Sequence, residues 1–246
     1  MRYPGGKSGS GVYQRIISQM PPHECYVEPF LGSGAVMRRK RPARFNLGFD
    51  LDAAVVQRAA NLVRAGEWLS GGARLVGPDD GGPVSWLFER YDSINWLARW
   101  TVPPRTLVYC DPPYLMSTRR SRGRVYRYEL GASRHEELLR VLLGLSALVM
   151  VSGYQCEMYD QALSSWRVVR YLTMTQGGPA EESLWCNFPE PVELHDYRFL
   201  GRDFRERERI RRKKARWVRM LSEMTVLERR AVESALMTVR TRDGTA

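Results

Sequence analysis

The chain has 246 residues, enough for one large domain or for a core domain with a small appendage. Its hydrophobic fraction of 43% is ordinary for a protein with a buried core, and its four cysteines and three histidines lack the spacing of a metal site. No apolar run is long enough to span a membrane, and because residues 1–7 contain no apolar h-region we expect no signal peptide. We therefore expect a cytoplasmic protein with reduced cysteines, no metal and no membrane partner.

The net charge of +11 favours a polyanionic partner such as nucleic acid. An arginine-rich proteome is the alternative explanation, because arginine far outnumbers lysine in this chain. How the charge is distributed along the chain, considered below, favours nucleic acid.

Apolar, strand-like runs alternate with segments of helical spacing through most of the chain. In the first part of the chain we expect a strand at 24–30, a glycine turn at 31–34, a helix at 35–41 ended by Pro42, a strand at 44–51, a helix at 53–65 and a loop at 66–83. A helix at about 84–100, a strand at 106–110, a basic loop at 116–127, a helix at about 133–145 and a strand at 148–152 should follow. The last expected elements are a helix at 156–163, strands at 168–173 and 183–188, and basic helical sequence from 202 to about 239.

This alternation predicts an α/β fold, Rossmann-like and doubly wound, with a mostly parallel sheet and an antiparallel closing strand. We expect the main domain to cover residues 1–195, with only a small insert between about 66 and 104. Residues 196–246 then form a basic helical C-terminal extension.

A glycine turn, Glu28-Pro29-Phe30-Leu31-Gly32-Ser33-Gly34, follows the first strand. Glycines there allow the backbone to approach a ligand at the carboxyl edge of the sheet, although such turns are also plain strand–helix connections. The turn lacks the third glycine of the dinucleotide fingerprint and the GK[ST] of a P-loop. Asp50, which closes the second strand, is placed to accept hydrogen bonds from ribose hydroxyls; capping the following helix is its alternative role, and Asp52 suits that role equally well.

A second motif, Asp111-Pro112-Pro113-Tyr114, ends the strand at 106–110. An aromatic amine is a poor nucleophile, and a carboxylate together with a rigidly held carbonyl can accept both of its hydrogens. We expect Asp111 and the Pro112 carbonyl to be these acceptors, with Tyr114 stacking on the base. A Pro-Pro turn that simply caps a buried strand is the structural alternative.

The order of these motifs resembles the Dam-like adenine-specific DNA methyltransferases. The resemblance rests on Tyr3-Pro4-Gly5-Gly6-Lys7, the glycine turn, Asp50 and Asp111 to Tyr114, and it extends through Ser152-Gly153 and Glu182 to Trp185. It implies methyl transfer from S-adenosylmethionine to the 6-amino group of adenine in double-stranded DNA, with the target base flipped out. The implied cofactor residues are Tyr3, Lys7, Phe30, Gly32, Ser33, Gly34, Asp50 and Asp111, and the implied catalytic residues are Asp111, Pro112 and Tyr114.

The interval between the second strand and Asp111 departs from this family, because it leaves little room for a separate recognition domain. Whether the enzyme reads a defined DNA site is therefore open. Methylation of another planar amine or amide (in cytosine, RNA or a protein glutamine) and a non-catalytic DNA-binding protein are the alternative functions.

Basic residues cluster in three places: at 38–41, on the loop after the second motif, and at 202–216. The loop carries Arg119, Arg120, Arg122, Arg124 and Arg127 with no acid among them, so we expect these arginines to bind DNA phosphates around an extruded base. Residues 202–216 hold nine basic and three acidic side chains. Either DNA contact or a solvated helix with internal ion pairs explains that segment.

Overall fold

The computed structural model describes residues 6–9, 11–70, 81–119, 123–175 and 178–243. The chain divides into two compact units, residues 1–199 and 200–246. Among the described residues, no helix is long and apolar enough to cross a bilayer, and no group of His, Cys, Asp and Glu could hold a metal ion. All four cysteines are free thiols, and three of them are buried.

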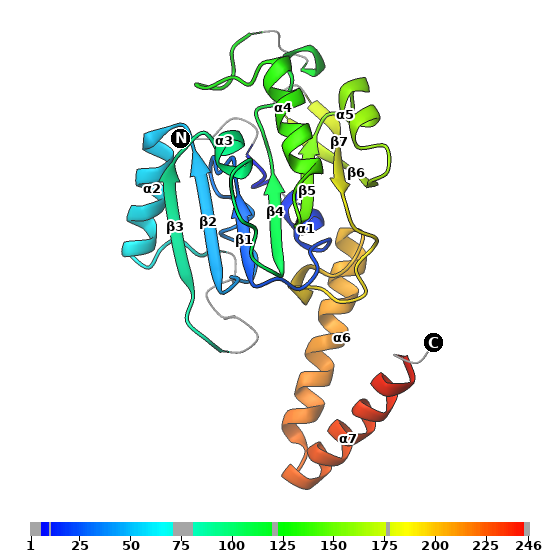
Figure 1. Ribbon diagram of the computed structural model, residues 1–246. Coiled ribbons are helices and arrows are strands. Elements are labelled where there is room, and N and C mark those ends of the chain that lie inside the picture. The colour runs from blue at the N-terminus through cyan, green and yellow to red at the C-terminus, as the bar shows by residue number, and fades with distance from the viewer. Residues whose placement is uncertain (1–5, 10, 71–80, 120–122, 176–177, 244–246) are drawn as a thin grey trace. The chain divides into compact units, whose positions relative to one another are not determined.

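A seven-stranded sheet with the order β3-β2-β1-β4-β5-β7-β6 forms the centre of the first unit (Figure 1). Its strands are β1 (Cys25–Glu28), β2 (Phe45–Asp50), β3 (Ser85–Arg90), β4 (Thr106–Cys110), β5 (Leu148–Gly153), β6 (Arg167–Thr175) and β7 (Gly178–Cys186). The first five are parallel, whereas β7 runs antiparallel to both β5 and β6. The predicted Rossmann-like fold with an antiparallel closing strand is confirmed.

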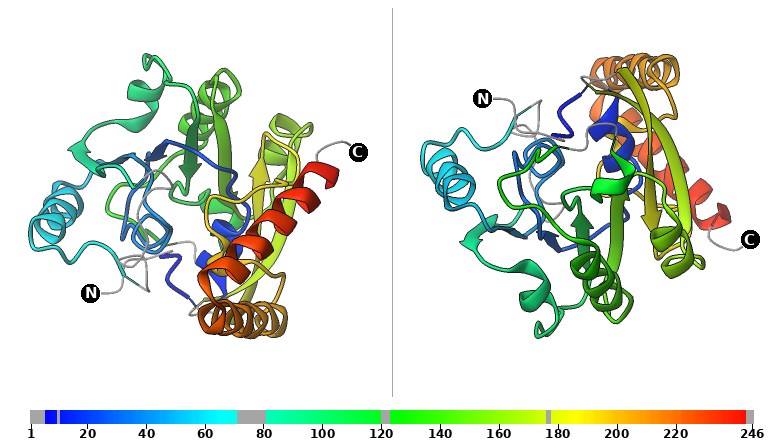
Figure 2. Two further views of the ribbon diagram at one scale, coloured as in Figure 1. Left: turned by 90° about the horizontal axis from the view of Figure 1, so that it is seen from below. Right: turned by 90° about the horizontal axis from the view of Figure 1, so that it is seen from above.

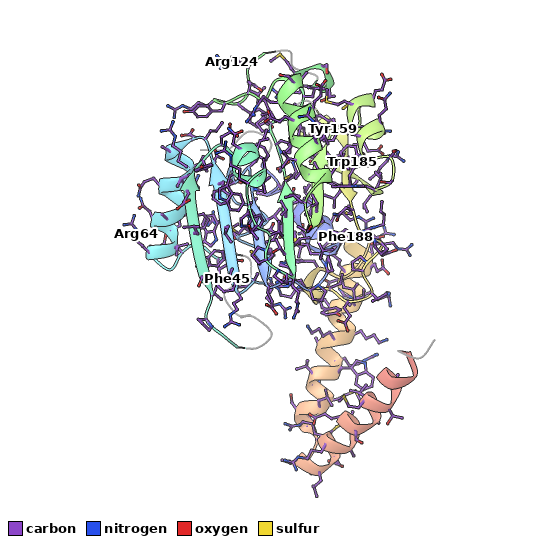
Figure 3. The ribbon with its side chains drawn as sticks, viewed as in Figure 1. Phe45, Arg64, Arg124, Tyr159, Trp185 and Phe188 are labelled. Carbon is purple, nitrogen blue, oxygen red and sulfur yellow. The ribbon has the colours of Figure 1, made fainter. Side chains whose placement is uncertain are left out.

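Helices cover both faces of this sheet (Figures 1 and 2). Those of the first unit are α1 (Val12–Ile17), α2 (Ala53–Arg64), α3 (Ser93–Leu97), α4 (Ala132–Leu143) and α5 (Glu157–Ala162), with short 3-10 turns η2 (Met116–Thr118) and η3 (Tyr197–Phe199). One core cluster joins α1 and α2 to the sheet, and the other joins α3, α4 and α5 to its opposite face. In Figure 3, Tyr159 of α5 lies beside Trp185 of β7, with ring centroids 5.2 Å apart.

The chain order reverses between β1 and β4, which are neighbours in the sheet. Loops that leave the carboxyl ends of two such strands diverge to opposite faces, and the crevice between them is where α/β sheets bind ligands. The glycine turn follows β1 and the Asp111 turn follows β4, so the fold brings both predicted motifs to this crevice.

The predicted helix at 35–41 is wrong. Residues 35–39 form successive turns, although Arg38 N–H bonds to the Gly34 carbonyl (2.9 Å) as in a helix. Met37 N–H instead donates to the Glu28 carboxylate at 2.8 Å. Arg39 N–H and Lys40 N–H then both bond to the Val36 carbonyl (3.0 and 2.9 Å) just before Pro42, so no regular ladder of i to i−4 bonds continues.

The predicted helix at 84–100 is also wrong, because this segment begins as strand β3 and only then forms the short helix α3. Trp86 and Phe88 alternate with more exposed neighbours and pack with Trp68, so the segment has a period of two. Asp92 then caps α3 by accepting from the backbone of Ile94 and Asn95. Helical spacing of the tryptophans concealed this edge strand.

The second unit contains helices α6 (Phe204–Glu223) and α7 (Val226–Asp243), which diverge from the turn between them (Figure 1). Helical sequence was expected here, and the structure divides it into two helices. Thr225 ends that continuity, because its Oγ1 accepts from Glu228 N–H (3.3 Å) while the Glu228 carboxylate accepts from Thr225 N–H (2.8 Å). This reciprocal pair is a capping box, which starts a new helix.

Candidate active site

A cavity of about 350 Å³ lies at the carboxyl edge of the sheet. This volume falls within the usual range for small-molecule and cofactor sites. Its lining includes six of the predicted cofactor residues: Lys7, Phe30, Gly32, Ser33, Asp50 and Asp111. Gly34 is not among the lining residues, and Tyr3 lies outside the described residues.

The glycine turn owes its shape to two left-handed glycines, Gly32 (φ 49°) and Gly34 (φ 60°). A Cβ on Gly34 would lie 2.5 Å from the Trp68 ring, so this glycine permits close packing beneath the cavity. Gly32 faces the cavity, and its N–H donates to Asp50 Oδ2 at 2.9 Å. The two glycines therefore have different roles, one in packing and one at the site.

The sequence left open whether Asp50 or Asp52 caps helix α2. Asp52 caps α2 by accepting from Ala54 N–H at 3.0 Å. Asp50 instead accepts from Gly32 N–H and from Asp52 N–H (2.9 Å each), which fastens the glycine turn to the end of β2. Burial raises the pKa of Asp50, although these backbone donors oppose the rise. A carboxylate is thus held at the cavity wall with lone pairs left for a ligand.

The Asp111 carboxylate lies at the end of β4 with two donors on a single oxygen. Lys7 Nζ is 2.8 Å from Oδ1, and the Ser152 hydroxyl donates to the same atom at 3.1 Å. Tyr109 hydroxyl, 2.7 Å from Ser152 Oγ, completes the chain of donors. Oδ2 has no hydrogen-bond partner among the residues that the structure describes, which leaves one acceptor oxygen for a substrate.

Opposing effects set the pKa of Asp111. Burial and the neighbouring Glu182 carboxylate raise it, while Lys7 and Ser152 lower it, and the net result is a raised pKa. For Lys7, burial opposes the charged form, but Asp111 and Glu182 outweigh burial and raise the pKa of the amine. Lys7 therefore remains an ammonium ion at neutral pH although its side chain is only 4% exposed.

Glu182, on β7, is a site residue that the sequence analysis did not select. Its Oε2 accepts from the hydroxyls of Tyr114 (3.0 Å) and Tyr171 (3.1 Å), and it lies 3.4 Å from Lys7 Nζ. The available signal was a carboxylate close to the apolar end of a predicted strand, in Glu182-Ser183-Leu184-Trp185. A buried acid of that kind requires partners, and here it finds three.

Tyr114 lies deeper than a stacking platform was expected to lie. Its side chain is 6% exposed, Lys7 Nζ lies 4.7 Å from its ring centroid, and Tyr154 packs against it edge to face. The cause is its hydroxyl, which accepts from Lys7 at 2.6 Å and donates to Glu182. A base could stack on this ring only after the Lys7 ammonium moved aside.

Arg119, one of the arginines expected to bind DNA, is engaged in contacts within the protein. Its side chain is 7% exposed and forms an ion pair with Glu129 at 2.6 Å, and its guanidinium also donates to the Tyr114 carbonyl. Glu129 additionally accepts from the N–H groups of Val125 (2.8 Å) and Tyr126 (3.0 Å). Arg119 therefore ties the loop at 123–130 to the Asp111 turn, an arrangement that the acid-free span 119–127 could not show.

The loop at 123–130 covers the cavity, since residues 125–130 belong to its lining. Arg127 is exposed and pairs with Asp52 at 3.1 Å. Arg124 is exposed and points away from the sheet in Figure 3. Arg120 and Arg122 lie outside the described residues. Arg124 and Arg127 thus remain accessible for a partner, whereas Arg119 does not.

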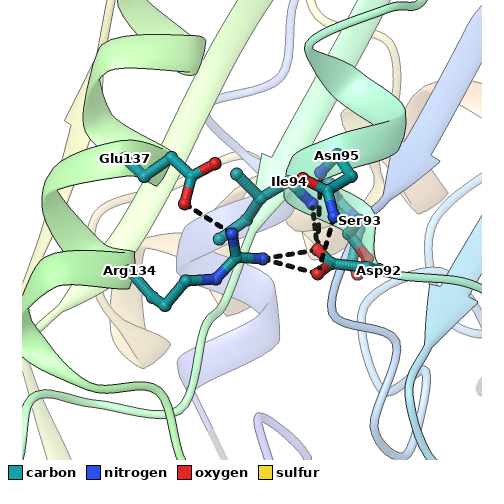
Figure 4. A network of polar contacts seen from close by, with 7 residues as sticks. Asp92, Ser93, Ile94, Asn95, Arg134 and Glu137 are labelled. Carbon is teal, nitrogen blue, oxygen red and sulfur yellow. Dashed lines mark hydrogen bonds and ion pairs between the residues drawn. The ribbon is translucent and has the colours of Figure 1, made fainter.

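Asp92 and Arg134 form a second polar wall of the cavity (Figure 4). Arg134 donates to both carboxylate oxygens of Asp92 at 2.6 Å and to Glu137 at 2.5 Å. A bidentate pair of this kind fixes both partners, here joining α3 to α4. Ser93, next to Asp92, donates to the Pro29 carbonyl and thereby links α3 to the glycine turn.

Comparison with known proteins found no matching family model and no matching curated protein. Solved structures with a similar fold include M. capricolum TrmK in complex with S-adenosyl-homocysteine, with 6% identity, a TM-score of 0.45 and coverage of 96% of this chain and 97% of that one. Magnesium protoporphyrin IX methyltransferase from Synechocystis with bound S-adenosylmethionine has 11% identity, a TM-score of 0.40 and coverage of 72% and 75%. An rRNA methylase from Streptococcus thermophilus has 10% identity, a TM-score of 0.40 and coverage of 71% and 92%. All three TM-scores are below 0.5, so these similarities do not extend to a reaction or a substrate.

Proposed function

We propose that this protein transfers a methyl group from S-adenosylmethionine to the exocyclic 6-amino nitrogen of adenine in double-stranded DNA, with the target base flipped out of the helix. The observation that carries the proposal is Asp111, a partly buried carboxylate (19% exposed) at the cavity wall whose Oδ2 has no partner among the described residues. The proposal also draws on the resemblance of the Tyr3-to-Lys7, Glu28-to-Gly34 and Asp111-to-Tyr114 motifs to the Dam-like enzymes.

The chemistry of the cavity lining fits this cofactor. S-Adenosylmethionine carries a sulfonium and an ammonium group, and the lining supplies six carboxyl groups against three basic side chains: Glu28, Asp50, Asp52, Asp92, Asp111 and Glu129 against Lys7, Arg127 and Arg134. Asp50 stands at the end of β2, where a carboxylate can accept hydrogen bonds from ribose hydroxyls. Phe30, Ile94 and Leu130 supply apolar surface for a purine ring.

Asp111 is the residue that we place at the reacting nitrogen. The cofactor, when bound, supplies an activated methyl group on a sulfonium ion. Asp111 Oδ2 would accept one N–H of the target amine, and the Pro112 carbonyl would accept the other. Both bonds turn the nitrogen lone pair out of conjugation with the ring, so it can form the N–CH3 bond while the S–CH3 bond breaks. The nitrogen then loses its extra proton, for which Asp111 is the nearest acceptor.

Methyl transfer to defined polymers tests this proposal. Duplex DNA, transfer RNA and a glutamine-containing protein would each be incubated with the protein and with S-adenosylmethionine labelled in the methyl group. We expect label in DNA alone. Label only in RNA or in protein would contradict the proposal.

Asp111→Asn separates chemistry from cofactor binding. Asparagine keeps the size of the side chain but presents only one acceptor oxygen and no charge, so we expect transfer to fall about 100-fold or more. Affinity for S-adenosylhomocysteine, measured by calorimetry, should change much less. Unchanged transfer in this variant would rule out the role assigned to Asp111.

A further inference from the structure

Helix α6 (Phe204–Glu223) carries a regular row of arginines. We propose that the arginine row formed by Arg205, Arg209, Arg212, Arg216 and Arg219 binds the phosphate backbone of duplex DNA. This inference deepens the proposed function, on which it rests for the choice of DNA as the polyanion.

The spacing of these five arginines places them on one face of the helix. Successive members are separated by four, three, four and three residues, which keeps side chains aligned along a helix with 3.6 residues per turn. At a rise of 1.5 Å per residue the row is about 21 Å long, equal to about six base pairs of duplex. All five side chains are exposed, with fractions of 67%, 80% and 81% for Arg209, Arg212 and Arg219.

Internal ion pairs do not neutralise this helix. α6 contains nine basic residues and three glutamates, a net charge of +6. Within the arginine row, Arg209 lies 3.6 Å from Glu206, Arg212 lies 3.0 Å from Glu208, and Arg219 lies 3.0 Å from Glu223. Exposed pairs of this type are screened by solvent and contribute little to stability, so a phosphate group can displace or share them.

The second unit carries most of the excess charge of the chain. Residues 200–246 contain fourteen basic and seven acidic residues, so they supply +7 of the net +11. This is less than a fifth of the sequence, and its charge is spread along a long helix. Such a concentration of charge favours association with a polyanion through release of condensed counterions.

Nucleic acid fits the arginine row better than a bilayer surface does. A helix that lies on a membrane needs one continuous apolar face beside its basic residues. Apart from Phe204 at its start, the exposed large apolar side chains of α6 (Trp217, Val218 and Met220) lie in its last two turns, so no exposed apolar face runs the length of the arginine row. Arginine also matches phosphate with two parallel N–H donors, whereas lysine acts as a point charge.

Two charge-matched double variants of the full chain test this inference. Arg209→Gln with Arg216→Gln removes two charges from the arginine row. Arg211→Gln with Lys214→Gln removes two charges from other faces of the same helix, and in each pair one residue forms an ion pair with a glutamate. Glutamine is a good helix former, so both variants should keep α6 intact, which circular dichroism would check.

The readout is affinity for a duplex of about two helical turns over a range of salt concentration. Each lost phosphate contact lowers the slope of log affinity against log salt by about 0.9, so we expect the row variant to lose one to two units of slope. Its affinity at low salt should fall about tenfold, and the control variant should stay within about threefold of wild type. Equal losses in the two variants would show a general charge effect and overturn the inference.

Three further outcomes distinguish DNA from a membrane partner and distinguish failure of this inference from failure of the proposed function. If the row variant loses binding to phosphatidylserine vesicles but not to duplex, the surface belongs to a membrane and the inference is wrong. If the row variant binds and methylates DNA as wild type does, the inference fails while the proposed function stands. If the wild type binds duplex through the row but transfers no methyl group to it, the proposed function fails and the row remains a DNA-binding surface.

Discussion

Lys7 links the acceptor, the tyrosine and the second carboxylate of the site. Its Nζ contacts Asp111 Oδ1 (2.8 Å), the Tyr114 hydroxyl (2.6 Å) and Glu182 Oε2 (3.4 Å). A buried ammonium with two carboxylates near it is held in place by charge, and it lies where a target base would enter above Tyr114. We infer that Glu182 positions Lys7 and Tyr114, and that it acts on Asp111 through them.

Substitution of Glu182 tests this positioning role. In Glu182→Gln the hydroxyls of Tyr114 and Tyr171 and the Lys7 ammonium lose a charged partner. Hydrogen bonds to charged groups contribute about 1.5–3 kcal/mol, so we expect kcat to fall about 10- to 100-fold. The acid limb of the pH profile should also move to lower pH, because Glu182 raises the pKa of Asp111.

Glu181→Gln is the matched control for this substitution. Its side chain is 57% exposed and lies 3.9 Å from Arg170, outside the Lys7 network. It should leave both kcat and the pH profile unchanged. If the two variants behave alike, Glu182 has no positioning role.

At the scale of elements, the loop at 123–130 connects the Asp111 turn to the cavity. Glu129 accepts from Arg119 and from two backbone N–H groups of the same loop, and these donors lower the pKa of Glu129 to about 2. The loop is therefore held as one piece over the cavity by a single carboxylate. Its arginines then differ in role, since one supports the loop and others point outward.

Arg119→Gln should weaken cofactor binding and leave DNA binding largely intact. The substitution removes a charge-assisted pair that holds residues 125–130 against the cavity, and we expect the Kd for S-adenosylhomocysteine to rise about tenfold. Arg124→Gln, on the exposed part of the same loop, should leave this Kd unchanged. Calorimetry measures the Kd, and salt titration of duplex binding measures the DNA contact. A changed salt slope with an unchanged cofactor Kd would contradict this role for Arg119.

At the scale of the whole molecule, all three histidines are buried and neutral. Burial lowers the pKa of each: His23 well below its usual value, His135 to about 4 and His195 to about 2. His23 and His195 stack with ring centroids 3.7 Å apart, and each uses one ring nitrogen on a backbone carbonyl. Protonation of either ring would place a charge near Lys40 and Arg41.

Stability should consequently fall as the pH drops below about 6.5. In this range the unfolded chain binds protons at its histidines while the folded chain does not, and each histidine costs about 1.4 kcal/mol per pH unit. Glu28 offsets the contribution of one histidine. Burial raises its pKa to about 8, so the folded state binds the proton of Glu28 more tightly than the unfolded chain does. The free energy of unfolding in urea, measured at several pH values, tests this prediction.

His23→Asn with His195→Gln should flatten this pH dependence. Asparagine mimics the Nδ1 donor of His23, and glutamine mimics the Nε2 donor of His195, so the bonds to the Pro21 and Arg41 carbonyls can persist. The double variant has two fewer groups that bind protons on unfolding. An unchanged slope between pH 6.5 and 5 would show that other groups cause acid unfolding.

Local patterns in the sequence predicted four of the five parallel strands, all except β3, and the turns that follow β1 and β4. Apolar runs such as Thr106 to Cys110 are locally distinctive, and the carboxyl ends of parallel strands share one edge of a sheet, so the crevice followed. Patterns failed where a distant side chain decided the outcome. Glu182, for example, meets Lys7 from 175 residues away along the chain.

The same limit of sequence patterns explains why the role of Arg119 could not be predicted. Arg119 looked like its neighbours in the sequence, because its partner Glu129 lies just beyond the basic span and reaches it only through the fold of the loop. By contrast, the break between α6 and α7 could have been read from Thr225-Val226-Leu227-Glu228, whose capping box is a local signal. Sequence patterns do not show which side chains from separate parts of the chain will pair with each other.

The identity of the modified nucleoside tests the central claim most directly. Duplex DNA would be treated with the protein and S-adenosylmethionine labelled in the methyl group, digested to nucleosides, and analysed by mass spectrometry. We predict label in N6-methyladenine, formed in equal amount with S-adenosylhomocysteine and lost in Asp111→Asn. Label in a methylated cytosine, or no label in any nucleoside, would contradict the account.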